Sequence, residues 1–164
     1  MFFGSSSGNT SAVAELIKDK LSDDDAELHD VALISIYEVG LYNKMILGVP
    51  TWSGGKLQKD WKLFLEVLKK ADLKNKKVAL FGLGDQEAYP DNFVDSLGEI
   101  YDYFVKRGCR VVGKWPLDGY HFNNSRAVID NKFVGLVLDE DTQSLETEKR
   151  VSLWVEQIKK EFNS

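Results

Sequence analysis

Six small polar residues near the start of the chain, Ser5-Ser6-Ser7-Gly8-Asn9-Thr10, could bind an anion. They follow an apolar run at residues 1–4 and precede apolar residues at helical spacing from Val13 onward, so they fall where a strand becomes a helix. The first N–H groups of a helix have no partner within it and lie at the positive end of its dipole. Together with four hydroxyl groups, this arrangement favours a dianionic phosphate. The same residue types also cap ordinary helices, and these six residues alone leave both interpretations open.

Two further loops carry aromatic side chains that fit no helix or strand pattern. Trp52 follows an apolar run at residues 45–49, and Tyr89 follows another at residues 78–83. An aromatic ring can stack on a flat conjugated ligand, although a single loop aromatic more often folds back onto the core. Gly54 and Gly84 let the backbone of these loops come close to a ligand. Two such rings beside a phosphate-type turn favour a ligand site.

The strands and helices that the sequence predicts would place these three loops in space. Apolar runs predict strands at residues 45–49 and 78–83, over 110–115 and 133–138, and more weakly near 28–33. Helical spacing predicts helices after the first loop, around residues 61–68 and 93–104, and over 151–162. Continuous apolar strands that alternate with helices indicate an α/β fold with a parallel sheet covered on both faces. Ligands bind such sheets beyond the carboxyl ends of the strands, and all three loops leave those ends.

The composition argues against several classes of function. A chain of 164 residues with 43% hydrophobic content fits one domain over residues 1–164. Its net charge of −5 argues against a nucleic-acid partner. A single cysteine, Cys109, and two histidines far apart in sequence argue against a disulfide and a metal site. The sequence shows no signal peptide and no membrane-length apolar run, so we expect a cytoplasmic or other reducing compartment and no membrane partner.

A phosphate turn beside two aromatic rings predicts a ligand with a phosphate attached to a flat ring system, and FMN fits that description. Two other kinds of nucleotide-binding site are excluded, because residues that they require are missing from this loop. A Walker loop needs a lysine after its last glycine, and none follows Gly8. A dinucleotide-binding turn needs G-x-G-x-x-G after the first strand, where only Gly4 and Gly8 are available.

Several blocks of the sequence, in order, resemble the flavodoxins of the long-chain type. They are the Phe-Phe-Gly-Ser-Ser-Ser-Gly-Asn-Thr start, Pro-Thr-Trp at 50–52, Leu-Gly-Asp-Gln at 83–86, Asp-Gly-Tyr-His-Phe at 118–122, Lys-Phe-Val-Gly-Leu at 132–136 and Leu-Asp-Glu-Asp at 138–141. The resemblance runs from Phe2 to Phe162. It implies a flavodoxin-like doubly wound sheet of five parallel strands in the order 2-1-3-4-5. It also implies that an insertion over about residues 116–132 splits the last strand.

The resemblance also implies which residues bind FMN. The phosphate would be held by Ser5, Ser6, Ser7, Gly8, Asn9 and Thr10. Trp52 would pack on the inner face of the flavin and Tyr89 on the outer face. The edge of the ring would meet Thr51, Ser53, Gly54, Leu83, Gly84, Asp85 and Asn92, and Asp141 would reach the ribityl chain. A peptide in the second loop turns over on reduction in this family, and we place that change at Ser53–Gly54. No residue is expected to be catalytic or to bind a metal.

The implied function is a low-potential, one-electron carrier with non-covalent FMN, not an enzyme. Acidic residues follow the third loop and the last strand, and the three loops contain no lysine or arginine, so the anionic reduced flavin would be penalised. We expect a monomer that docks basic redox proteins such as ferredoxin–NADP reductase or pyruvate:ferredoxin oxidoreductase. The main alternative is an FMN-dependent NAD(P)H:quinone reductase on the same fold, which needs open space over the ring. A third is an FMN-dependent activator of a metalloenzyme.

Overall fold

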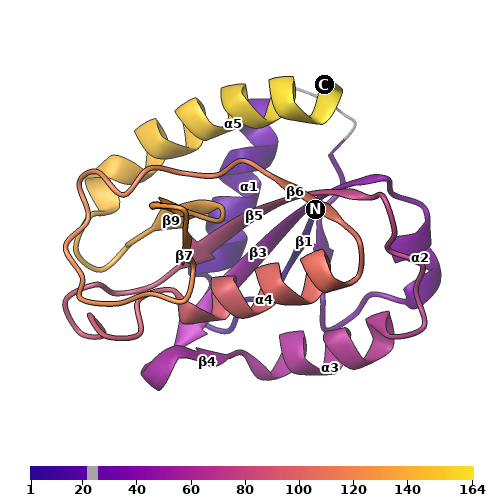
Figure 1. Ribbon diagram of the computed structural model, residues 1–164, viewed down its shortest axis with the longest axis horizontal. Helices are drawn as coiled ribbons and strands as arrows, with labels where there is room; N and C mark the ends of the chain where they lie inside the picture. The colour runs from indigo at the N-terminus through magenta and orange to yellow at the C-terminus, as the bar shows by residue number, and fades with distance from the viewer. Residues whose placement is uncertain (22–25) are drawn as a thin grey trace.

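A twisted parallel sheet forms the centre of the computed structural model, which describes residues 1–21 and 26–164 (Figure 1). Its strands lie in the spatial order β2-β1-β3-β5-β6, and β9 also pairs with β5. The bounds are β1 Phe2–Phe3, β2 His29–Asp30, β3 Lys44–Trp52, β5 Lys77–Leu83, β6 Arg110–Val112 and β9 Leu136–Leu138. The predicted α/β class and strand order 2-1-3-4-5 are confirmed.

The last strand of the sheet is split, as predicted. β6 pairs with the first half of β5, where Lys77 lies opposite Arg110, and β9 pairs with the second half, where Phe81 lies opposite Leu136. The intervening residues 113–135 leave the sheet and form a two-stranded antiparallel ribbon of β7 (Val128–Ile129) and β8 (Lys132–Phe133). The predicted extended runs 110–115 and 133–138 are therefore longer than the strands that form.

Helices cover both faces of the sheet (Figure 1). α1 (Asn9–Leu21) and α5 (Thr147–Asn163) pack side by side on one face, while α3 (Lys59–Leu68) and α4 (Asp95–Lys106) cover the other. Hydrogen bonds join α4 to α3, since Tyr103 Oη and Arg107 donate to carbonyls of residues 65 and 68. The pattern did not predict the short helix α2 (Ile36–Gly40).

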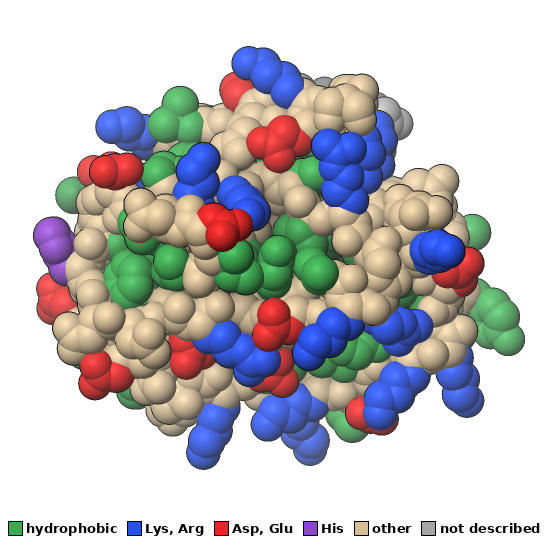
Figure 2. All heavy atoms as spheres, in the orientation of Figure 1, with side chains coloured by type: hydrophobic (Ala, Val, Ile, Leu, Met, Phe, Trp, Pro, Cys, Tyr) green, Lys and Arg blue, Asp and Glu red, His purple; other side chains and the backbone are tan. Residues whose placement is uncertain are grey.

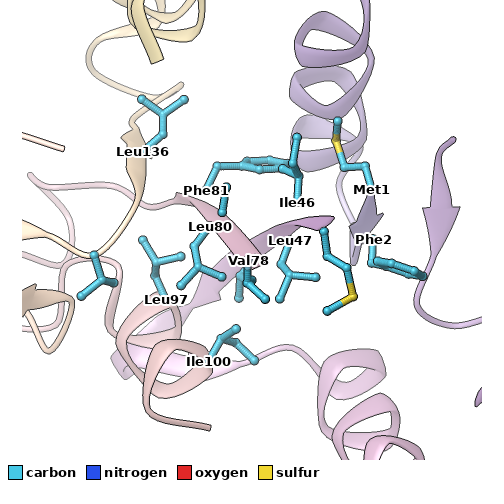
Figure 3. Close-up of a cluster of buried hydrophobic side chains, with 14 of the residues drawn as sticks. Met1, Phe2, Ile46, Leu47, Val78, Leu80, Phe81, Leu97, Ile100 and Leu136 are labelled. Atoms are coloured by element: carbon cyan, nitrogen blue, oxygen red, sulfur yellow. The ribbon is translucent and has the colours of Figure 1, made fainter. Parts of the chain in front are cut away.

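Apolar side chains fill the space between these layers (Figure 3). Leu47 of β3 and Val78 of β5 lie in the middle of the sheet, and Leu97 and Ile100 of α4 lie against it. β3 and β5 are buried along most of their length, which agrees with their continuous apolar sequence. A rigid centre of this kind fixes where β1, β3, β5 and β9 end, and therefore where their loops meet.

Candidate functional site

The loop between β1 and α1 is shaped by a left-handed glycine and by two side-chain hydrogen bonds. Gly8 has a φ of 94°, a left-handed conformation that favours glycine. The backbone N–H of Gly8 donates to Ser5 Oγ at 3.1 Å, and Ser11 Oγ donates to the carbonyl of Gly8 at 3.1 Å. α1 begins at the next residue, Asn9, so its first N–H groups lack partners within the helix. The N–H groups at the start of α1 are therefore available to a ligand, as an anion site would require.

A cavity of about 310 Å³ opens beyond the carboxyl ends of the strands. It brings together four segments that are far apart in the sequence: the first loop, the end of β3, the loop after β5 and the residues after β9. Its walls are Ser7, Asn9, Thr10, Pro50, Thr51, Trp52, Leu83, Gly84, Asp85, Tyr89, Glu140 and Asp141. Two of these, Pro50 and Glu140, were not predicted as site residues.

The two aromatic residues of the cavity have exposed side chains. Trp52 is 46% exposed and Tyr89 is 40% exposed, although both carry a large, mostly apolar ring. Neither side chain has a hydrogen bond to another described residue. Each ring therefore offers a free face, and a flat ligand in the cavity would cover it.

A buried hydroxyl group at the end of β3 also lacks a partner. Thr51 Oγ1 is shielded from solvent, yet no hydrogen-bond partner lies near it in the described part of the chain. A buried polar atom without a hydrogen bond is costly, so such atoms mark places where a ligand or water completes the bonding. Thr51 lines the cavity, which makes it a candidate ligand contact.

Six of the predicted site residues do not line this cavity. They are Ser5, Ser6, Gly8, Ser53, Gly54 and Asn92. Ser5, Ser6 and Gly8 belong to the first loop, whose other members reach the wall. Ser53 and Gly54 lie in the 3₁₀ turn η1 (Ser53–Gly55) directly after Trp52, and Gly54 has a φ of 70°. Asn92 stabilises the third loop, because its N–H donates to the Tyr89 carbonyl at 3.3 Å.

A fully buried carboxylate, Asp139, organises two walls of the cavity, and the sequence analysis did not single it out. Its Oδ2 accepts hydrogen bonds from the backbone and side chain of Gln86 at 3.0 and 2.9 Å and from Thr142 Oγ1 at 2.7 Å. Its Oδ1 accepts from the N–H groups of Asp141 and Thr142. Asp139 thereby joins the loop after β5 to the loop after β9. In the sequence, Asp139 was one of several acidic residues that follow the last strand, and nothing marked it as buried.

The cavity is acidic, and lysines lie to one side of it. Asp85, Glu140 and Asp141 line its walls, and no lysine or arginine of the described chain does so. Loss of solvent raises the pKa of Asp141, and repulsion from Asp85 and Asp139 raises it further. A neighbouring hollow next to Trp52 is lined by Lys56, Lys59 and Lys62. Figure 2 shows lysine and arginine side chains gathered along the lower edge of the molecule, over α3.

No three potential metal ligands gather anywhere within residues 1–21 and 26–164. In the same part of the chain, no helix is both long and apolar enough to cross a bilayer.

Comparisons with known proteins identify the family of the chain. The family model for flavodoxin matches residues 1–154. The flavodoxin of a Nostoc species is 44% identical over 162 residues, which cover 99% of this chain and 95% of that protein. Flavodoxin 1 of Escherichia coli is 45% identical over 164 residues, with 99% and 93% covered.

A solved structure agrees with this assignment. The flavodoxin of Fusobacterium nucleatum bound to flavin mononucleotide has a TM-score of 0.91 and 34% identity, with 98% of this chain and 95% of that chain covered. Similarity in sequence and in fold therefore extends over nearly the whole chain and includes the loops that line the cavity. This chain belongs to the flavodoxin family.

Proposed function

We propose that this protein binds FMN non-covalently and carries electrons, one at a time, between redox enzymes. Flavodoxins are electron-transfer flavoproteins, and the relative from Fusobacterium nucleatum was solved with FMN bound. The observation that carries the proposal is the cavity itself. A donor-rich loop and two exposed aromatic rings meet in it at the carboxyl ends of the strands, where such sheets bind ligands.

The residues present fit FMN. The first loop, Ser5 to Thr10, offers hydroxyl and N–H donors to the phosphate group, and Gly8 permits its sharp turn. Trp52 and Tyr89 would contact the two faces of the ring system. Thr51 Oγ1 would gain a hydrogen bond, which removes the cost of leaving it buried and unpaired. Ser53, Gly54, Leu83, Gly84, Asp85 and Asn92 would border the edge of the ring, and Asp141 would lie by the ribityl chain.

Bound FMN supplies the redox chemistry, and the chain sets the energy of its charge states. The two aromatic side chains exclude water from the ring, which lowers the local dielectric and strengthens repulsion between negative charges. Asp85, Glu140 and Asp141 add negative charge to the walls. Extra negative charge on the ligand is therefore penalised, so we expect a low potential for the second electron.

Gly54 is suited to a change of peptide orientation in the second loop. Its φ of 70° and ψ of 26° are readily reached by glycine, and a Cβ at this position would meet no atom within 4 Å. We propose that the Ser53–Gly54 peptide turns between redox states so that its carbonyl faces the ring. Val at position 54 would raise the free energy of the present conformation, because a β-branched residue rarely adopts a positive φ.

The charge distribution favours basic partners at the acidic walls of the cavity. We propose docking of enzymes such as ferredoxin–NADP reductase or pyruvate:ferredoxin oxidoreductase, steered by Asp85, Glu140, Asp141 and their acidic neighbours. The proposal includes a cytoplasmic monomer without a membrane or nucleic-acid partner. It also includes one domain over residues 1–164, with the excursion between β6 and β9 as the long-chain insertion.

The alternative, an NAD(P)H:quinone reductase, is not favoured. The matched relatives are flavodoxins, and a nicotinamide or quinone would need the space over the ring that Tyr89 would occupy. A direct comparison is to mix the FMN-loaded protein with NADPH alone and follow flavin absorbance. A carrier stays oxidised, and rapid bleaching would support the reductase.

An anaerobic reductive titration of the FMN-loaded protein tests the proposed function. We expect two separate one-electron steps in the absorbance, the second of which needs the stronger reductant. Reduction in one two-electron step would contradict a one-electron carrier. Failure of the protein to bind FMN would overturn the proposal as a whole.

A further inference from the structure

Gln58, at the start of α3, has a buried side chain in contact with the first loop. Only 3% of Gln58 is exposed, an unusual burial for a glutamine at a helix end. Its Nε2 donates to Ser6 Oγ at 2.8 Å, across 52 residues of sequence. β4 (Lys56–Leu57) and the start of α3 lie at the carboxyl end of β3, so Gln58 joins the second loop region to the first (Figure 1).

The neighbouring carboxylate fixes which end of the Gln58 amide faces Ser6. Gln58 Nε2 also lies 3.5 Å from Asp60 Oδ2. A carboxylate oxygen can only accept a hydrogen bond, so the amide group that faces both Ser6 and Asp60 must be the NH₂. Ser6 Oγ is therefore the acceptor in its bond with Gln58.

Packing holds the Gln58 side chain in this position. A Cβ on Gly4 would lie 2.0 Å from Gln58 Oε1 and 2.7 Å from the Trp61 ring, so the space beside Gly4 is filled by α3. Trp61 Nε1 donates to the Gly48 carbonyl at 2.9 Å, and the Gly4 N–H donates to the same carbonyl at 3.2 Å. The start of α3 and the start of the first loop are thus fixed to one point of β3.

We propose that Gln58 is a positioning residue for the phosphate-binding loop, acting through Ser6. Because Gln58 donates to Ser6 Oγ, the hydroxyl proton of Ser6 is free to be donated to a phosphate oxygen. A hydroxyl that accepts one hydrogen bond also becomes a better donor in the next. The inference rests on the proposed function, since it concerns the phosphate group of FMN. It assigns a task to a buried side chain that does not line the cavity.

The variant Gln58→Met tests the inference, because Met fills a similar volume without an amide. We expect its Kd for FMN to rise about tenfold, as for the loss of one well-oriented hydrogen bond. Its Kd for riboflavin, which lacks the phosphate, should stay within about twofold. Gln157→Met is the matched control: it removes a glutamine on α5 that donates to the Lys114 carbonyl, and both affinities should be unchanged.

Ser6→Ala separates positioning from general stability. If Gln58 acts through Ser6, then Gln58→Met in the Ser6→Ala background should cause little further loss of FMN affinity. Gln58→Glu is a second variant for the case in which Met disturbs folding. It replaces the donor with a carboxylate that accepts a hydrogen bond from the Ser6 hydroxyl, so FMN affinity should fall more than riboflavin affinity. Equal losses for FMN and riboflavin in these variants would overturn the inference.

Inorganic phosphate provides a readout independent of the flavin. Phosphate should raise the Tm of the wild-type apoprotein, and less so in Gln58→Met. An equal Tm increase in both proteins would overturn the role of Gln58 and leave the proposed function intact. A wild-type protein that binds neither phosphate nor FMN would instead overturn the proposed function, and this inference with it.

Discussion

Two pairs of aromatic residues, each a tryptophan and a tyrosine, have opposite surroundings. Trp52 and Tyr89 are 46% and 40% exposed at the cavity, whereas Trp115 and Tyr120 are each 8% exposed. Trp115 Nε1 donates to Tyr120 Oη at 3.0 Å, and Tyr120 Oη donates to the Val137 carbonyl at 2.5 Å. The Arg150 guanidinium lies 4.1 Å from the centre of the Tyr120 ring. The first pair lacks such contacts within the described chain.

The difference separates residues that we propose contact a ligand from residues that stabilise the fold. Trp115 and Tyr120 belong to the excursion between β6 and β9, and their polar atoms are satisfied within the protein. They fix that excursion to β9. The cavity-lining residues Glu140 and Asp141 come shortly after β9. Trp52 and Tyr89 leave apolar surface in water, which folding alone does not favour. Substitutions in the two pairs should therefore affect different properties.

Trp115→Ala should give the largest effect of these substitutions. It should lower the stability of the fold and leave FMN affinity nearly unchanged. It removes a buried ring and leaves the Tyr120 hydroxyl without its donor, at a cost of about 3–5 kcal/mol in the free energy of unfolding. Urea unfolding of the apoprotein measures this loss. The fraction that remains folded should bind FMN with nearly unchanged affinity. A mild loss of stability with a large loss of FMN affinity would remove the distinction between the pairs.

Tyr89→Ala should have the converse effect. Loss of one stacking face would weaken FMN binding by about 10- to 100-fold, which corresponds to about 1.4–2.8 kcal/mol. The free energy of unfolding of the apoprotein should change little, because the ring is exposed and makes no side-chain hydrogen bond within the described chain. Fluorescence quenching of FMN measures the affinity. Tyr101→Ala, a half-buried tyrosine on α4 outside the cavity, is the control and should leave FMN affinity unchanged.

The sheet could be predicted from sequence because its central strands are buried on both faces. The apolar runs at 45–49 and 78–83 became β3 and β5 for that reason. α2 was missed because it has five residues and exposes Tyr37 at 85%, with Leu33 and Leu41 beside it also exposed, so no apolar face marks it. Phe93 was assigned to a helix face but precedes α4, whose start is set by Val94 at a φ of 48°. Periodicity does not reveal such a backbone conformation.

Tyr120→Phe tests the buried tyrosine through the pH dependence of stability. Burial raises the pKa of Tyr120 to about 12, from 10 in the unfolded chain. The protonated form is thus favoured by folding, so its contribution to stability is complete below pH 10 and is lost as the pH rises through 12. At pH 8 the variant should be about 1–3 kcal/mol less stable, because Trp115 Nε1 and the Val137 carbonyl lose their partner. That deficit should shrink between pH 10 and 12, and a constant deficit would contradict the buried hydroxyl.

The sequence singled out the loops that line the cavity, but not the groups that support those loops. Exposed residues such as Trp52 and Tyr89 stand out because no pattern explains them. Asp139, Glu140 and Asp141 are consecutive acidic residues, and their sequence does not show which one turns inward. The structure buries Asp139 and gives it the N–H groups of Gln86 and Thr142. The contact of Gln58 with the first loop could not be predicted either, because its partner Ser6 lies 52 residues away in the sequence.

Two neighbouring carboxylates, the cavity-lining Asp141 and the buried Asp139, differ in the same way, with the smallest predicted effect. The pKa of Asp141 is raised in the folded protein. At neutral pH, where Asp141 is ionised, this lowers the stability of the fold. The effect disappears at low pH, where Asp141 is protonated in both the folded and the unfolded chain. Asp141→Asn should stabilise the apoprotein at pH 7 by a few tenths of a kcal/mol, since exposed charges are screened. The gain should vanish near pH 3. Asp139→Asn should instead destabilise, because its amide would face donors, and urea unfolding of the two variants in parallel measures the difference. If both substitutions changed the free energy of unfolding in the same direction, the two carboxylates would not differ as their hydrogen bonds indicate, and this prediction would be wrong.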